Sequence, residues 1–255
     1  MSGSFGGILR KWRSLRRFSQ LRLAEEVGVS SRHISFLETG RSSPSKEIIV
    51  KLSGFLHIPR REVNRALMVS GYAPIYRETI ESDSDMNPIY FAVDKMINDH
   101  MPFPAIVLNQ EWDLVKANAA AIRLLEEVGF NKSNNLIESL AMDDPKTSKI
   151  CNWGETASVV LNRVRYEIDM LGSSSKLVRL EHMLRTCVKN NNVDDSVDHS
   201  QVALNTQFRI GGEILSFFSV VSQLGAVLDV IVSGFKIEML FPCDEVTKKY
   251  YEGMG

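Results

Sequence analysis

The sequence has few of the residues on which disulfide scaffolds and metalloproteins depend. Only three of its 255 residues are cysteines, and Cys151, Cys187 and Cys243 lie far apart with no CxxC pair. An odd number of distant cysteines without a signal sequence excludes a disulfide framework and favours reduced thiols, hence a cytoplasmic protein. We expect no metal site from these thiols, even with His182 nearby in the sequence.

Long apolar runs and the common catalytic motifs are also missing. No stretch approaches the ~18 consecutive apolar residues of a membrane-spanning helix, so a membrane protein is not expected. Neither HExxH nor GxSxG occurs, and the glycine pairs at 6–7 and 211–212 lack the context of a nucleotide loop. We therefore predict a protein that is not an enzyme, with no catalytic residue and no cofactor.

Charge is distributed unevenly along a chain whose length suits two domains. Residues 1–72 carry 13 Lys and Arg against five Asp and Glu, whereas the remainder carries 17 against 26. A basic segment joined to an acidic one is typical of a DNA-binding head attached to a body that avoids phosphate.

The stretch from Ser19 to Gly40 contains two short helical patterns joined by a tight turn. Ser19 and Ser30 stand where an N-cap hydroxyl would accept from the first free N–H groups of each helix. Gly28 falls where the first helix must close in a left-handed conformation. Two helices joined in this way predict a helix-turn-helix, whose second helix presents its first residues to base edges.

This stretch resembles the Cro/lambda-repressor type of helix-turn-helix, the XRE family. The matching residues agree without a gap and are Ser19-Gln20, Leu23-Ala24, Val27-Gly28-Val29-Ser30, Ile34-Ser35, Leu37-Glu38, Gly40-Arg41 and Pro44. The resemblance implies a phosphate contact and a bracing role for Gln20, a cap and phosphate contact for Ser30, and an ion pair between Arg13 and Glu38. The set of DNA-binding residues is Gln20, Ser30, Ser31, Arg32, Ser35, Phe36 and Arg41.

Phe36 departs from the polar residue common at its position in that family. An apolar ring there could contact a thymine methyl instead. Simpler interpretations of single residues stay open: Ser30 taken alone could be only a helix cap, and Arg32 taken alone a solvated surface charge. Gly40 to Ser45 forms a polar loop suited to lie along a phosphate strand.

The remaining patterns predict a five-helix head followed by a second domain. The head is completed by helices over 5–17, 45–58 and 61–70; it ends at residue 72, and 73–87 is a linker. For the domain over 88–255, we expect helices over 88–99, from 118, 153–170 and 175–189, and strands over 105–108, 112–116, 202–210, 213–224 and 235–241. The predicted fold class is an all-α head followed by an α+β, PAS-like domain, with one antiparallel sheet and helices on one side.

The passages YAPIY, HMPFPAIVLNQEWDLVKANAAA and FKIEMLFPCDEVT resemble the MmyB-like ligand-binding domain, a PAS-like module found behind XRE-type heads in bacterial regulators. The resemblance implies a pocket for a small apolar ligand such as a fatty acid. The candidate pocket residues are Phe103, Ile106, Leu124, Phe217, Phe218 and Phe235. Strand alternation allows only one of Phe217 and Phe218 to face the helices. The donor for a carboxylate stays open among Arg123, Arg163 and Arg165.

The functional prediction is a DNA-binding transcription regulator that binds a double-stranded operator as a homodimer and senses a small apolar ligand. Two alternatives stay open: a regulator whose second domain only dimerises or recruits a partner, and an enzyme with a DNA-binding head. A redox switch through Cys243 is a further, minor variant.

Overall fold

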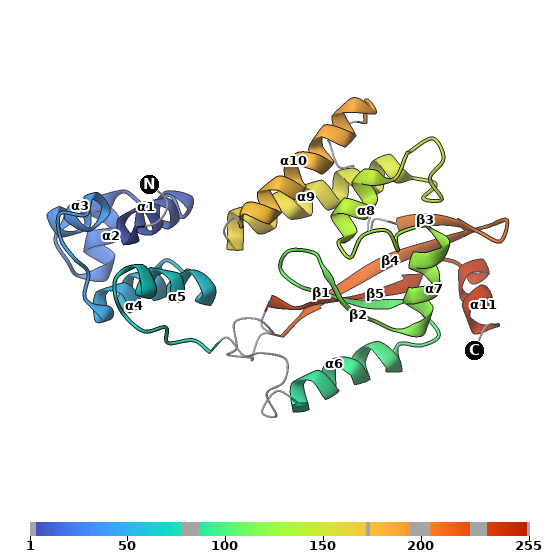
Figure 1. The fold of residues 1–255 in the computed structure, drawn as a ribbon, viewed down its shortest axis with the longest axis horizontal. Coiled ribbons are helices and arrows are strands. Elements are labelled where there is room, and N and C mark those ends of the chain that lie inside the picture. Colours follow the sequence, from blue (N-terminus) through green and yellow to red (C-terminus); the bar gives the residue numbers. More distant parts are fainter. Residues whose placement is uncertain (1–3, 78–86, 172–173, 194–204, 225–233, 254–255) are drawn as a thin grey trace. The chain divides into compact units, whose positions relative to one another are not determined.

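The computed structural model describes residues 4–77, 87–171, 174–193, 205–224 and 234–253. Two units can be described, each by itself: a head up to residue 77 and a second domain from residue 87. The head contains α1 (Phe5–Leu15), α2 (Gln20–Val27), α3 (Ser31–Thr39), α4 (Lys46–Phe55) and α5 (Arg60–Val69) (Figure 1). The five predicted helices are therefore confirmed.

The caps of the head helices follow the serines and glycines of the sequence. The hydroxyls of Ser19 and Ser30 accept from the amides of Arg22 and His33, both at 3.1 Å. Gly28 and Gly40 close α2 and α3 with φ of 71° and 73°. The apolar faces that these caps leave inward meet in one core, in which Trp12, Leu23, Ile34, Ile49, Leu56 and Leu67 are almost fully buried.

The head extends beyond the boundary expected at residue 72. The buried side chain of Asn64 accepts from the amides of Ile75 and Tyr76 at 3.1 and 3.0 Å, and donates to the carbonyl of Tyr76 at 2.7 Å. The side chain of Asn64 thus satisfies three backbone groups in the first part of the predicted linker and attaches that part to α5. Residues 78–86 of that linker lie outside the described residues.

The second domain is built on a five-stranded antiparallel sheet, as predicted. The strands are β1 (Ala105–Leu108), β2 (Leu114–Ala117), β3 (Asn205–Ile210), β4 (Glu213–Gln223) and β5 (Lys236–Pro242), in the order β2-β1-β5-β4-β3. Gly211 and Gly212, with φ of 58° and 89°, form the two-residue hairpin that pairs Ile210 with Glu213. Residues 202–204 of the predicted third strand lie outside the described residues.

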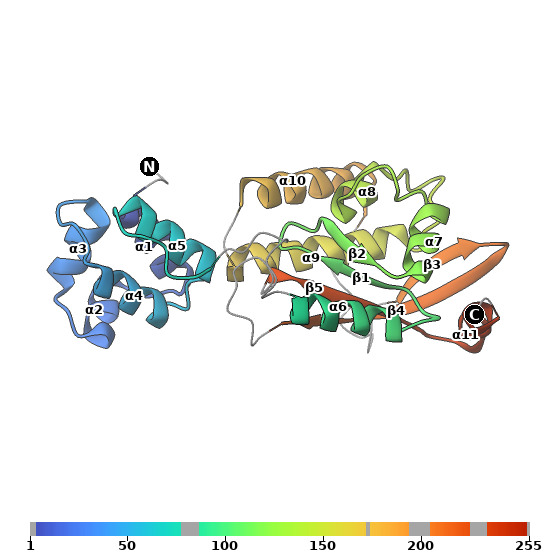
Figure 2. The same ribbon diagram turned by 60° about the horizontal axis from the view of Figure 1, so that its bottom comes forward.

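Helices cover both faces of the sheet, so the prediction of helices on one side was wrong. One face is covered by α6 (Asn87–Asp99), through Val93 and Ile97. The other face carries α7 (Ala119–Glu127), α8 (Leu136–Met142), α9 (Trp153–Leu171) and α10 (Ser175–Asn190) (Figures 1 and 2). The reason is visible in β1, whose four residues are all buried because both of its faces are packed.

A last helix, α11 (Glu245–Glu252), closes one end of this core and was not predicted, nor was α8. The hydroxyl of Thr247 accepts from the amide of Ser216 at 2.8 Å. The ring of Tyr251 meets that of Phe217 edge-on, with centroids 5.4 Å apart. The helix therefore ties the end of the chain to the middle of β4.

Candidate functional site: a DNA-binding helix and an apolar cavity

The predicted DNA-contacting side chains lie along α3 and the loop that follows it. Ser31 and Arg32 are exposed on the first turn, while Ser35 and Phe36 are half-buried one turn later. Arg41 is exposed just after Gly40 ends the helix. The first turn thus offers free N–H groups and a cationic side chain on one surface, the arrangement needed to approach phosphates and base edges.

A buried carboxylate fixes α3 to the two helices before it. Arg13 donates to Glu38 through Nε and Nη2 at 2.5 and 3.0 Å, which confirms the predicted ion pair. Gln20 Nε2 donates to the same carboxylate at 2.7 Å. Burial alone would raise the pKa of Glu38, but hydrogen bonds from Arg13 and Gln20 outweigh it and lower the pKa below its ordinary value.

The bracing role of Gln20 therefore has a structural basis, since its amide joins the start of α2 to α3. Its phosphate contact stays a prediction. The exposed Arg10 adds a further cation, with Nε 3.5 Å from Glu38 Oε2. Charge around this carboxylate is thus more than balanced, which suits a surface that faces phosphate.

Close backbone packing, which the sequence interpretation missed, also positions α3. At Gly6, a Cβ atom would lie 2.5 Å from the carbonyl oxygens of both Leu37 and Glu38. Only glycine allows α1 to cross the end of α3 at this distance. A glycine within an otherwise amphipathic helix was the available signal.

The second domain contains a cavity of about 150 Å³ between the sheet and the helices α7, α8 and α9. Its lining is mainly apolar and includes Ile106, Trp112, Ala121, Leu124, Leu125, Val128, Leu136, Leu140, Val160, Phe208, Phe217 and Leu240. Thr156, Thr206, Ser219 and Glu238 supply the polar part of the wall. A space of this kind takes an apolar molecule with few polar anchors.

Four of the six predicted pocket residues border this cavity: Ile106, Leu124, Phe217 and Phe218. Phe217 packs in the core, whereas the ring of Phe218 stacks on Phe241 with centroids 5.5 Å apart. Phe103 packs against the same core without bordering the cavity. Phe235 does not belong here, because alternation along the strand places it with Ile237 on the face under α6.

A buried polar cluster stands behind one wall of the cavity. Lys236 Nζ lies 2.8 Å from Glu167 Oε2, which also accepts from Trp112 Nε1 at 2.8 Å. Two cations lie over the indole ring of Trp112: Lys236 Nζ is 4.2 Å and the Arg163 guanidinium carbon 4.6 Å from the ring centroid. Burial outweighs the attraction of Glu167 and lowers the pKa of Lys236 to about 8.

Among the three arginines considered as ligand anchors, Arg163 bonds to Glu238, a residue of the cavity wall. Its Nη1 donates to Glu238 at 3.2 Å and its Nε to Glu167 at 3.3 Å, while Nη2 is buried and has no hydrogen-bond partner in the described part of the chain. Arg165 is paired with Glu181 at 3.1 Å, and Arg123 is exposed on α7. A buried donor without a partner costs free energy that a ligand acceptor would recover.

Comparison with known families now identifies both units. A model described as Helix-turn-helix matches residues 9–63, and the MmyB-like transcription regulator ligand binding domain matches residues 91–202. The chain is a DNA-binding transcription regulator with an MmyB-like ligand-binding domain. No curated protein matches it. Both families named from sequence motifs are therefore confirmed.

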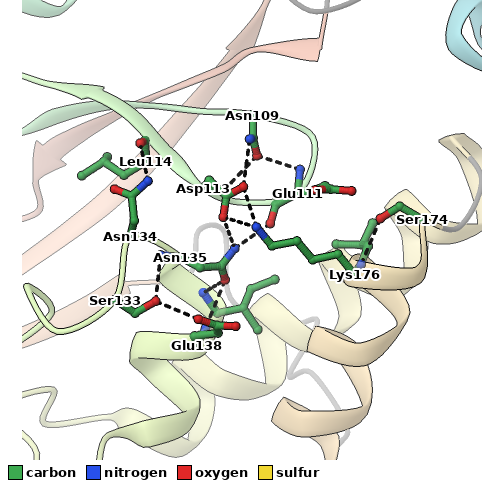
Figure 3. A network of polar contacts seen from close by, with 12 residues as sticks. Asn109, Glu111, Asp113, Leu114, Ser133, Asn134, Asn135, Glu138, Ser174 and Lys176 are labelled. Carbon is green, nitrogen blue, oxygen red and sulfur yellow. Dashed lines mark hydrogen bonds and ion pairs between the residues drawn. The ribbon is translucent and has the colours of Figure 1, made fainter.

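The regulator's helices α8 and α10 are held to the β1–β2 loop by a polar network (Figure 3). Asp113 accepts from Lys176 Nζ of α10 at 2.6 and 2.7 Å and from Asn135 Nδ2 at 2.9 Å. Asn135, almost fully buried, caps α8 through the amides of Ile137 and Glu138. One loop residue, Asp113, thus connects β2, α8 and α10.

The regulator's cysteines and acidic groups show no built metal site in the described residues. No group of three or more His, Cys, Asp or Glu is placed to hold a metal ion within the described part of the chain. Cys151 and Cys243 are exposed and Cys187 is half-buried, all as free thiols. Burial and Asp244 raise the pKa of Cys243, which opposes the thiolate that a redox switch needs. None of the described helices is both long and apolar enough to cross a membrane.

Proposed function

We propose that the regulator binds a two-fold operator as a homodimer, and that a small apolar ligand entering the cavity changes its affinity for that operator. The observation that carries this proposal is an apolar cavity inside the domain that belongs to a ligand-binding family. The three cysteines of the chain are free thiols, which supports a reducing, cytoplasmic location.

The size of the cavity limits the ligand. A cavity of about 150 Å³ lined by apolar side chains takes a group of roughly benzene size. A short fatty acyl chain fits this limit, and each buried methylene contributes about 0.8 kcal/mol. A longer chain would have to displace part of the cover formed by α8 and α9.

We assign the ligand's polar end to Arg163. Among the residues that the structure describes, its Nη2 is a buried donor that makes no hydrogen bond, and Glu238, which accepts from its Nη1, borders the cavity. The cluster pairs two cations, Arg163 and Lys236, with two carboxylates, Glu167 and Glu238. Because these charges balance, an ester or ketone oxygen suits Nη2 as well as a carboxylate does.

The homodimer follows from the size of one recognition helix, which reads only a few base pairs. Two heads about one DNA turn apart, ~34 Å, make a site of useful length. We place the dimer contact in the acidic domain because the basic heads face DNA phosphates. Light scattering of the full chain should give the mass of a dimer; a monomer whose bound sites have no symmetry would contradict this part.

The ligand is tested on full-length protein that has been stripped of bound lipid. Straight-chain carboxylic acids of four to fourteen carbons, and their methyl esters, are titrated while thermal stability and operator affinity are followed. We expect the shorter members to raise stability and to change operator affinity. If none alters either quantity, the second domain acts only in dimerisation or partner binding.

Substitution of the anchor sharpens this test. Arg163→Lys keeps the positive charge beside Glu167 and Glu238 but replaces three guanidinium nitrogens with one, and should weaken the best ligand at least about tenfold. Arg165→Lys, whose guanidinium pairs with Glu181, is the matched control and should bind like wild type. Equal affinity of both variants would remove Arg163 as the anchor.

A further inference from the structure

Three side chains at the DNA-facing end of the head form one compact group. The guanidinium carbons of Arg32 and Arg41 lie 5.1 and 5.9 Å from the ring centroid of Phe36. Arg32 and Phe36 are four residues apart on α3, so they share one face of the helix. We call Arg32, Phe36 and Arg41 the arginine–phenylalanine cluster.

Backbone contacts hold this cluster in place. The carbonyl of Phe36 accepts from the amides of Arg41 and Ser42 at 2.9 and 3.3 Å, which folds the loop back onto the helix. One turn away, Ser30 caps the helix, and Glu38 ties it to α1 and α2. The backbone that carries the ring and the two cations is therefore held in place before DNA is bound, which lowers the entropy lost on binding.

Phe36 can recognise only one feature of a base edge. Its ring has no hydrogen-bond donor or acceptor, and in the major groove the thymine methyl is the apolar group that a base offers. A guanidinium matches the O6 and N7 acceptors of guanine with two parallel hydrogen bonds. The 5.1 Å between ring and guanidinium covers one to two base steps of about 3.4 Å.

We propose that each operator half-site contains a thymine whose methyl group contacts Phe36, one or two base steps from a guanine read by Arg32. Arg41 contacts the neighbouring phosphate and carries no sequence information. The stacking of Arg32 on Phe36 makes the two readings depend on each other. This inference rests on DNA binding by the head and is independent of the ligand proposed for the second domain.

The first test selects binding sites for the full chain from a library of random DNA duplexes. Wild-type protein should enrich half-sites with thymine and guanine at this spacing. Phe36→Ala should lose the preference for thymine and weaken that for guanine, whereas Phe36→Leu should keep the thymine preference. Arg60→Ala removes a comparable cation–ring contact, between Arg60 of α5 and Tyr76, and should leave the selected sequence unchanged.

The second test alters single atoms of the selected site. Deoxyuridine in place of the thymine removes only the methyl group and should weaken wild type roughly three- to fivefold, with no effect on Phe36→Ala. 7-Deazaguanine removes N7 and should weaken wild type but not Arg32→Ala. Arg41→Ala should weaken all sequences alike and lower the salt slope by roughly 0.9.

The outcomes are distinguishable. Enriched sites without this thymine and guanine, or wild-type binding that is insensitive to deoxyuridine, would overturn the inference while leaving DNA binding intact. If no sequence is enriched at all, sequence-specific DNA binding fails and the inference fails with it. Should Phe36→Ala not fold, the deoxyuridine measurement on wild type alone decides.

Discussion

The carboxylate of Glu38 accepts hydrogen bonds from Arg13 and Gln20 and has no exposed side-chain surface. Glu38→Gln would leave Arg13 without its counter-charge. We expect the free energy of unfolding of the head to fall by about 3 kcal/mol. This is the lower end of the range for buried pairs, because Arg13 keeps some exposure. Hydrogen exchange of α3 amides in the full chain measures the loss. Glu62→Gln, which breaks a surface pair with Arg65, should cost less than about 1 kcal/mol.

The same carboxylate predicts a dependence on pH. Its pKa is lowered in the folded head, so its contribution is present above the ordinary value of about 4.3 and is lost as pH falls through the folded value. The stability difference between wild type and Glu38→Gln should therefore shrink below about pH 4. A difference that stays constant down to pH 3 would contradict the ionised pair.

Some single residues could be predicted from the sequence and others could not. Ser30, Arg13 and Glu38 occupy fixed offsets in a local motif, so their roles were found. Lys236 could not be found, because its partner Glu167 is 69 residues away and the pair meets only in the folded domain. A lysine between Phe235 and Ile237 in a strand was the one available signal. Phe235 was misplaced because the sequence did not show that the second face of the sheet is also covered.

At the scale of helices and strands, the crossing of α1 and α3 depends on Gly6. Gly6→Ala would place a methyl group 2.5 Å from two carbonyl oxygens and force the helices apart, at a cost of about 1–3 kcal/mol. Gly54→Ala is the matched control, since its Cβ would meet nothing within 4 Å on α4. It should stabilise the head by up to about 1 kcal/mol. The midpoint of thermal unfolding should fall for Gly6→Ala and rise for Gly54→Ala. Equal shifts of the two midpoints would refute the close approach of α1 and α3.

A second prediction at this scale compares two of the ion pairs that attach α10 to the rest of the domain. Lys176–Asp113 is partly buried and shares Asp113 with Asn135, whereas Arg179 of Arg179–Glu138 is largely exposed. Double-mutant cycles should give a coupling of about 1.5–3 kcal/mol for the first pair and less than about 1 kcal/mol for the second. Equal couplings would mean that the network in Figure 3 does not hold the helix.

Elements with a clear local signal were the ones predicted correctly. The hairpin at Gly211-Gly212 and the long helices α9 and α10 have clear local signals. The seven-residue α8 was missed because a pattern this short does not establish a helical period. The helices on both faces also escaped prediction, since a short, wholly apolar strand such as β1 is compatible with either arrangement.

For the molecule as a whole, DNA and ligand must affect each other equally. If a ligand changes operator affinity by some factor, the operator changes ligand affinity by the same factor. Typical couplings are about 5- to 150-fold. The two family matches lie in separate segments, 9–63 and 91–202, so the proposed ligand response requires a coupling between them.

The most direct test of the account is therefore one linkage measurement on the full chain. Operator affinity is measured with and without the best carboxylic acid of the length series, and affinity for that acid is measured with and without saturating operator. We predict two equal ratios of at least about fivefold at saturating acid and operator, and Arg163→Lys should need at least about tenfold more acid to reach them. Acid binding with both ratios equal to one would contradict the proposal that this regulator responds to its ligand.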